Sequence, residues 1–100
     1  MSDETTALLR ALLEGDARAV ADALHADVVF VKGDGTEHRG ADVVVAMFAG
    51  SDGAARYAVV ATDAAALRVE LTVSGIPGVM RFTLRGASEA GRLVLIRVEV

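Results

Sequence analysis

The sequence predicts an α+β fold in which three helices cover one face of a curved, mostly antiparallel sheet. Helical apolar stripes and one short hairpin fill the first half of the chain, whereas the second half has apolar residues at alternate positions, as strands do. The predicted order is two helices, two strands, a third helix and four more strands. Because 100 residues hold one core but not two, we expect a single domain over residues 1–100.

The first helix is predicted over Thr6–Leu13. Its leucines, at positions 8, 9, 12 and 13, lie on one side of a helix, and that side would pack against the core. Ser2 or Asp3 can accept a hydrogen bond from the free N–H groups at its start. We expect Gly15 to end the helix in the left-handed conformation that glycine tolerates.

A second helix is predicted over Ala17–Leu24, directly after the first. Asp16 is expected to be its N-cap, because a carboxylate at this position accepts hydrogen bonds from the N–H groups of the first turn. His25 would close the helix, where a cationic ring suits the negative end of the helix dipole. We therefore assign His25 a structural role.

A hairpin is predicted around the stretch "VKGDGTEHRG", residues 31–40. Asp27–Lys32 is rich in β-branched residues and predicts a strand, glycines 33 and 35 predict a turn, and Thr36–Arg39 predicts a short return strand. The charged or titratable side chains of this stretch are Lys32, Asp34, Glu37, His38 and Arg39. The hairpin becomes a functional site only if some of these side chains turn inward.

The segment "GADVVVAMFAG", residues 40–50, is predicted to form the third helix. Its three consecutive valines, at positions 43 to 45, favour a strand locally. Val44, Met47 and Phe48, however, share one helical stripe, and the two flanking glycines can bound a helix. The next residues, "SDGA" at 51–54, are expected to form a loop.

Four strands are predicted in an antiparallel meander: Tyr57–Ala61, Leu67–Val73, Met80–Arg85 and Val94–Val100. Turns are expected at "GIPG", residues 75–78, and at "GASEAG", residues 86–91. The inward, apolar face would consist of Leu67, Val69, Leu71, Val73, Met80, Phe82, Leu84, Val94, Ile96, Val98 and Val100. The outward face would consist of Arg68, Glu70, Thr72, Arg81, Thr83, Arg85, Leu93, Leu95, Arg97 and Glu99.

The composition excludes several classes of function. The net charge is −4 and the basic residues do not cluster, so nucleic-acid phosphates would find no basic surface. No apolar run approaches the roughly 20 residues of a membrane-spanning helix, and no signal peptide is recognisable, so we expect a cytoplasmic protein without membrane contact. With no cysteine and two histidines, we expect no metal and no cofactor. The 53% hydrophobic content is high for one small core and predicts a homodimer.

The stretch "LLEGDARAVADALHADVVF", followed by a turn and "RGADVVVAMF", resembles the NTF2-like superfamily, in particular its SnoaL-like and ketosteroid-isomerase-like branches. The matching marks are Gly15-Asp16 between two helices, Ala26–Val29 at the start of the first strand and Arg39-Gly40 before the third helix. The resemblance covers essentially the whole chain. It implies a cone, in which a strongly curved sheet wraps around the helices, with an apolar pocket at one end and a dimer through the outer sheet face.

In such a cone we expect two sets of functional residues. The ligand pocket would be lined by Leu12, Phe30, Lys32, Met47, Phe48, Tyr57, Met80 and Phe82. The dimer face would include Arg68, Glu70, Arg81, Thr83, Leu95 and Arg97.

The isomerase branch shifts a double bond with a carboxylate base, while a tyrosine and a protonated acid bind the enolate. At the matching positions this chain has Leu8 for the tyrosine, Lys32 or Gly33 for the base, and Met80 or Phe82 for the acid. No tyrosine and no carboxylate stands at any of these positions, and apolar side chains can neither take a proton nor donate a hydrogen bond to an oxyanion. Ketosteroid-type isomerisation is therefore excluded.

The remaining weak candidates for catalysis are His38, Lys32 and Asp34. Lys32 continues the inward alternation of Val28 and Phe30, so it can serve as a cation for an acidic ligand or as an amine base, although strand-end lysines are more often simply solvated. Asp34 lies between two glycines, where aspartate most often forms a turn. His38 could be a general acid or base at the pocket rim, as histidine side chains often are, but an exposed hairpin histidine is the commoner outcome.

Three functions remain open. The first is a small dimeric domain that binds a small apolar or weakly acidic ligand and has no catalytic set, because few polar groups are expected to point inward. The second is an acid/base enzyme of the cyclase, dehydratase or isomerase type. The third is a regulatory interaction module with a filled pocket, since the first half is also similar to the SnoaL-like domain at the end of some sigma factors.

Overall fold

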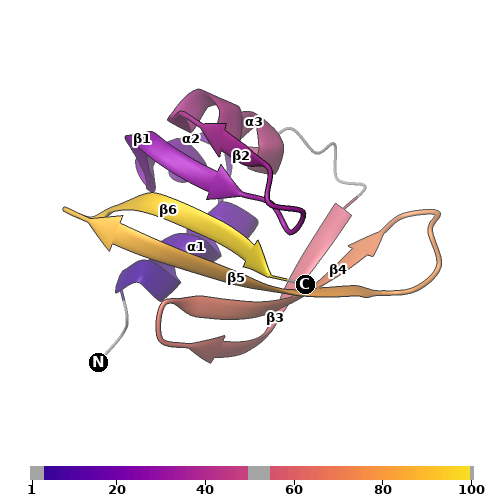
Figure 1. Cartoon of the computed structure of the whole chain (residues 1–100). Coiled ribbons are helices and arrows are strands. Elements are labelled where there is room, and N and C mark those ends of the chain that lie inside the picture. Colours follow the sequence, from indigo (N-terminus) through magenta and orange to yellow (C-terminus); the bar gives the residue numbers. More distant parts are fainter. Residues whose placement is uncertain (1–3, 50–54, 100) are drawn as a thin grey trace.

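The computed structural model of the chain describes residues 4–49 and 55–99 (Figure 1). The elements are α1 (Glu4–Glu14), α2 (Ala17–Asp22), β1 (Leu24–Val31), β2 (Glu37–Arg39), α3 (Ala41–Ala49), β3 (Ala55–Asp63), β4 (Ala66–Val73), β5 (Met80–Glu89) and β6 (Arg92–Glu99). This order confirms the predicted one. The expected caps Ser2 and Asp3 and the expected loop 51–54 lie outside the described residues.

One curved, open sheet of six strands forms the body of the fold. Its strand order is β2-β1-β6-β5-β4-β3, in which β1 runs parallel to β6 and every other neighbouring pair is antiparallel. Helix α1 packs on strands β3 to β6, and α2 and α3 pack on β1 (Figure 1). The sheet is therefore mixed but mostly antiparallel, as predicted, and the helices lie on its concave face.

The boundary between α2 and β1 differs from the prediction. Helix α2 ends at Asp22, and Leu24 already pairs with Leu93 of β6. The Leu93 N–H group donates to the Ala23 carbonyl oxygen at 2.8 Å, which fixes this junction. His25 thus belongs to a strand and does not close a helix; its Nδ1 atom accepts a hydrogen bond from the Asp27 N–H group at 3.0 Å. Pairing with β6 outweighs the local helical pattern.

Gly15 is required for a different reason than predicted. Its backbone is not in the left-handed region. A Cβ atom at this position would lie 2.6 Å from the Ala11 carbonyl oxygen and 2.7 Å from the Ala19 Cβ atom, so only glycine lets α1 and α2 meet this closely. The N-cap prediction for Asp16 is confirmed, because its Oδ1 atom accepts a hydrogen bond from the Ala19 N–H group at 2.9 Å.

The last two strands are longer and less regular than predicted. Strand β5 continues to Glu89, so the expected turn over residues 86–91 shrinks to the tight connection before β6. The pairing of β5 with β6 shifts between Ala87 and Ser88. Because of this bulge, Leu93 and Ile96 are both fully buried although they are three residues apart, and the predicted outward position of Leu93 is wrong.

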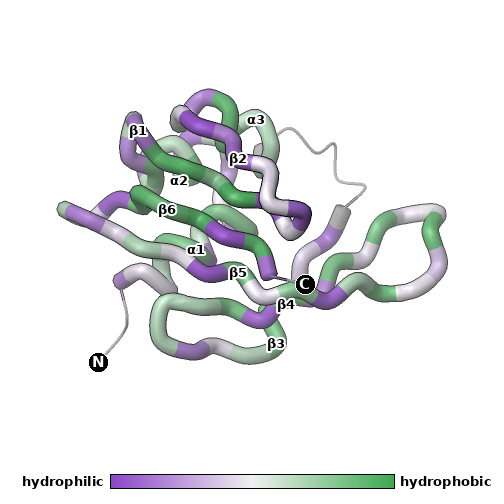
Figure 2. The backbone as a smooth tube through the Cα atoms, viewed as in Figure 1, coloured by the Kyte–Doolittle hydropathy of each residue, from purple (hydrophilic) through white to green (hydrophobic). Residues whose placement is uncertain are grey.

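A single apolar core fills the space between helices and sheet. Its fully buried side chains are Leu9, Leu12, Val20, Leu24, Val28, Val44, Leu67, Val69, Leu84, Leu93 and Ile96. Not all apolar residues lie in this core. Figure 2 shows an apolar stretch at the end of the β4–β5 hairpin, which projects from the body of the fold. There Ile76, Val79 and Met80 expose 63%, 52% and 64% of their surface. No helix in the described ranges is long and apolar enough to span a membrane.

Candidate functional site

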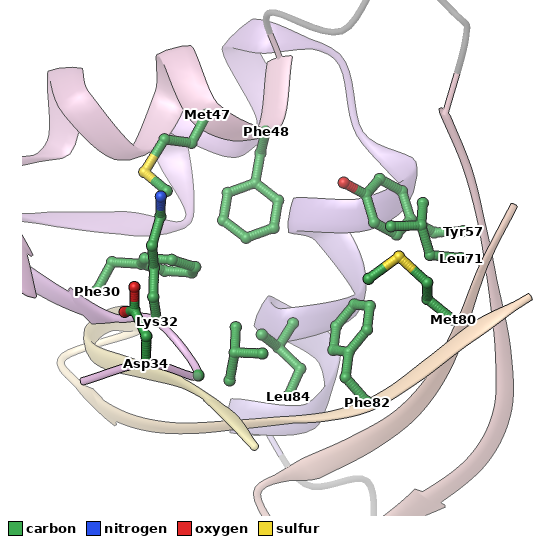
Figure 3. Close-up of a pocket in the computed structure, with 12 residues that line it drawn as sticks. Phe30, Lys32, Asp34, Met47, Phe48, Tyr57, Leu71, Met80, Phe82 and Leu84 are labelled. Carbon is green, nitrogen blue, oxygen red and sulfur yellow. The ribbon is translucent and has the colours of Figure 1, made fainter. Parts of the chain in front are cut away.

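A cavity of about 450 Å³ opens between α3, the β1–β2 hairpin and strands β3 to β6 (Figure 3). Phe30, Lys32, Gly33, Asp34, Met47, Phe48, Tyr57, Leu71, Met80, Phe82, Leu84 and Val98 line it. Its size is within the range of small-molecule sites, and its walls are mostly aromatic or aliphatic.

The cavity wall follows from the alternation of the strands. Met80, Phe82 and Leu84 of β5 point inward, and the cross-strand partners Leu71 and Val98 extend this wall onto the two neighbouring strands. All five of these side chains stand at positions that the alternation in the sequence predicts to face inward. A bent, inward-facing apolar sheet surface thus becomes the floor of the cavity.

Two aromatic pairs stiffen the walls. The rings of Phe30 and Phe48 meet edge to face, with centroids 5.5 Å apart and planes at 81°. Tyr57 and Phe82 form a second edge-to-face pair, at 6.4 Å and 90°. Such pairs are favourable beyond the area that they bury, so these rings hold defined positions around the cavity.

Lys32 combines a structural and a cavity-lining role. Its backbone N–H group donates to the Thr36 carbonyl oxygen at 2.8 Å and closes the hairpin. Its side chain extends along the cavity wall, with the ammonium group beside Met47 (Figure 3). The residue is exposed at the mouth, and the ammonium makes no hydrogen bond or ion pair with any described residue. A positive charge thus stands at an apolar wall with no ion pair among the described residues, and the Asp34 carboxylate is the acid that its charge influences.

The Asp34 side chain stabilises the hairpin turn. Its Oδ1 atom accepts a hydrogen bond from the Thr36 N–H group at 2.9 Å. The backbone and side-chain hydrogen bonds of Thr36, with a smaller contribution from the Lys32 charge, hold the pKa of Asp34 below its ordinary value of 3.8. The carboxylate therefore stays ionised near neutrality and is a poor proton acceptor.

His38 lies on the side of the hairpin that faces α3. It pairs with Phe30 in the β1–β2 register, so both side chains lie on the same face. Its Nε2 atom is buried and has no hydrogen-bond partner among the described residues. His38 borders a second hollow of about 520 Å³, together with Lys32, Asp42, Val43, Ala46 and Met47. Because Lys32 and Met47 border both spaces, the lysine stands between the main cavity and the histidine.

No known family model matches the sequence, and no curated protein matches it either. Solved structures do. An NTF2-like protein of unknown function from Mesorhizobium loti superposes with a TM-score of 0.82 at 17% identity, over 99% of this chain and 92% of that one. The chain has an NTF2-like fold.

Other proteins with the NTF2-like fold superpose with somewhat lower scores. An LEH-like epoxide hydrolase from M. tuberculosis gives a TM-score of 0.73 at 19% identity, over 96% of this chain and 81% of that one. A hypothetical protein with a ketosteroid isomerase-like fold from Catenulispora acidiphila gives 0.65 at 12%, over 100% and 86%. At these identities the likeness concerns the fold, which enzymes and proteins of unknown function share.

Within the NTF2-like cone, the predicted pocket residues mostly come together. Phe30, Lys32, Met47, Phe48, Tyr57, Met80 and Phe82 all line the cavity. Leu12 does not line the cavity; it is 1% exposed and lies in the core between the helices and the sheet. Gly33 and Asp34 also line the cavity at its mouth, which was not predicted. Both directly follow Lys32 in the sequence, so the predicted inward position of Lys32 could have indicated them.

The predicted dimer-face residues lie on the opposite side of the NTF2-like sheet. Arg68 pairs with Thr83 and Glu70 with Arg81 in the β4–β5 register, and all four alternate with inward residues. The Arg81 Nε atom donates to the Glu70 Oε2 atom at 2.9 Å. Leu95 and Arg97 continue the same face on β6, where Arg85 also donates to Glu99.

Proposed function

We propose that this chain is a ligand-binding domain whose cavity takes a small apolar carboxylic acid, with the carboxylate placed at the Lys32 ammonium group. The observation that carries the proposal is a lysine on the wall of an apolar cavity whose ammonium group forms no hydrogen bond or ion pair with any described residue. An anionic group of a ligand could form the ion pair that this ammonium group lacks. The rest of the ligand would contact Phe30, Phe48 and Phe82.

The physical chemistry of the cavity supports this assignment. A charge-assisted hydrogen bond between ammonium and carboxylate is stronger than a neutral one, and it strengthens further where apolar walls exclude water. Lys32 lies at the mouth, so a carboxylate bound there can keep part of its hydration. Asp34 is already bonded to Thr36 and carries the same sign of charge as the ligand, so it favours a single carboxylate over a dianion.

Isothermal titration of a panel of aromatic and alicyclic monocarboxylates, each with its neutral amide, tests the proposal. We expect the acids to bind more tightly than their amides, and Lys32→Met to weaken the acids about fivefold while leaving the amides unchanged. Arg39→Met is the matched control, because it removes one positive charge from the same hairpin at an exposed side chain. If no acid binds, or if Lys32→Met has no effect, the proposal fails.

A second function, acid/base catalysis, is favoured by one observation. The buried Nε2 atom of His38 has no partner among the described residues, and Lys32 separates it from the cavity. A substrate that reaches past Lys32 would meet an imidazole nitrogen that can accept or donate a proton. Turnover of a bound acid that disappears in His38→Gln but survives in Arg39→Met would support an enzyme; equal turnover in both variants, or none in the wild type, would contradict it.

We also propose that the outer sheet face forms a homodimer. Val31 and Leu95 lie on this face as outward neighbours of Arg97, and no described helix covers them. Partly exposed apolar side chains among charged ones are a common composition of protein interfaces. The cavity opens on the other side of the sheet, so dimerisation would leave it accessible.

A further inference from the structure

The cavity contains a second polar group across from the lysine. In Figure 3 the Tyr57 hydroxyl points into the cavity from β3, whereas Lys32 and Asp34 reach it from the β1–β2 hairpin on the other side. We infer that the Tyr57 hydroxyl is a specificity-determining group, and that the cavity selects carboxylic acids with a hydroxyl or carbonyl group at the end remote from the carboxylate. This inference rests on the proposed function.

The position of the Tyr57 ring is well defined by its neighbours. Tyr57 pairs with Leu71 in the β3–β4 register, and both side chains line the cavity. The edge-to-face contact with Phe82 fixes the tilt of the ring. A hydroxyl on a ring held in this way can act as a fixed hydrogen-bonding point for a ligand.

The hydroxyl is also free to bind. It makes no hydrogen bond with any residue in 4–49 or 55–99. The cavity wall near it consists of Phe48, Leu71, Met80 and Phe82, none of which offers a strong acceptor or donor. Before a ligand binds, water can satisfy the hydroxyl, because the site is open to solvent.

Ligand binding changes the hydrogen bonding of the Tyr57 hydroxyl. A wholly apolar ligand end would displace water from the Tyr57 hydroxyl and leave it unsatisfied, which costs free energy. A ligand hydroxyl or carbonyl would replace the lost hydrogen bond. The site therefore distinguishes two ligands of equal shape by one polar group, in the way that sites built to hydrogen-bond a substrate reject the analogue that lacks the group.

The apolar wall between the two polar groups defines the middle of the ligand. Phe30 and Phe48 meet edge to face between Lys32 and Tyr57, so a flat aromatic or alicyclic body can lie against them. The ligand class is thus a hydroxy- or oxo-substituted aromatic or alicyclic monocarboxylic acid. Its carboxylate and its second polar group lie at opposite ends.

Matched pairs of acids test the inference. We would measure the binding of benzoic, 2-naphthoic and biphenyl-4-carboxylic acid by calorimetry, each with and without a hydroxyl at the far end, because the three bodies differ in length. On the body whose length fits, we expect the hydroxyl to raise the affinity about three- to tenfold. In Tyr57→Phe, which keeps the ring and its contact with Phe82, this gain should vanish while the affinity for the unsubstituted acid stays the same.

Thr83→Val is the matched control, because it removes a hydroxyl from the outer face of the same sheet and should leave the gain intact. If the unsubstituted acids bind but no hydroxyl improves binding, or if the gain persists in Tyr57→Phe, the inference is overturned and the proposed function stands. If no acid binds at all, both are overturned. Unchanged thermal unfolding of Tyr57→Phe would show that its effect is local.

Discussion

Asp34 shows how one turn residue sets a local electrostatic property. Because hydrogen bonds from Thr36 lower its folded-state pKa below 3.8, its carboxylate stabilises the folded chain at pH values above the pKa of the unfolded chain. This contribution is lost as the pH falls through the folded-state pKa. We expect an NMR titration of the Asp34 side chain to give a midpoint below 3.8.

The control for this prediction is Asp34→Asn, which keeps an acceptor for the Thr36 N–H group but cannot ionise. Its urea-unfolding free energy should decrease less on acidification than that of the wild type. A wild-type midpoint at or above 3.8 would contradict the assignment of the turn hydrogen bonds.

Single residues also show where prediction from the sequence succeeds. Strand alternation is a strong local signal, and it correctly predicts that Phe30, Lys32 and Phe82 face the cavity. Leu12 lies on a helical stripe that faces the sheet, and the sequence does not say whether core or cavity meets that stripe. Packing of α1 against β4 to β6 decides this, and it is a property of the whole fold.

The connection between α1 and α2 depends on the absence of one side chain. Gly15→Ala would bring a Cβ atom to 2.6 Å from the Ala11 carbonyl oxygen, so one helix must shift. We expect a loss of about 1–3 kcal/mol in the free energy of unfolding, measured with urea. Gly15→Asn should be at least as destabilising, because its side chain is larger.

Gly35 provides the contrasting case. It has a positive φ of 89°, and no atom lies within 4 Å of the place that a Cβ atom would take, so its requirement is conformational and not steric. Asparagine tolerates the left-handed region better than alanine. Gly35→Asn should therefore be less destabilising than Gly35→Ala, and the same order at Gly15 would argue against close packing there.

Element boundaries were harder to predict than element types. All nine predicted elements are present in order, because most have a clear period of apolar residues and the glycines at 33 and 35 mark the hairpin that contains β2. The start of β1 and the bulge in β5 and β6 were missed, since both depend on hydrogen bonds between residues far apart in the sequence. The bulge shifts the alternation of β6, which explains why Leu93 is buried and Leu95 faces outward.

The charge of the outer sheet face should make the proposed dimer dependent on salt concentration. The face carries Arg68, Arg81, Arg85 and Arg97 against Glu70 and Glu99, so two copies of it repel each other at low ionic strength. We expect the dimer fraction, measured by sedimentation equilibrium, to increase between about 20 mM and about 500 mM salt, because salt screens exposed charges.

Variants on the same face separate charge from general effects of salt. Arg97→Gln should raise the dimer fraction at low salt and weaken its salt dependence. Arg18→Gln, an exposed residue on α2, should change neither. A chain that stays monomeric under all these conditions would refute the dimer.

At the scale of the whole molecule, the cone and its pocket were predicted from the order of elements and from family resemblance. The open volume of the pocket was not, since it depends on the curvature of the sheet and on how far α3 stands from it. Small side chains could have let the cone close. The structure instead leaves about 450 Å³, which supports the two ligand-based functions over a filled interaction module.

The exposure of Met80 links the cavity to oxidative chemistry. Its thioether forms part of the cavity wall, yet 64% of the residue is open to solvent at the end of the projecting hairpin. Peroxide can therefore reach the sulfur, and a sulfoxide would place a polar, bulkier group on an apolar wall. Oxidation at this one atom would weaken the proposed binding of apolar acids, and a methionine sulfoxide reductase would restore it.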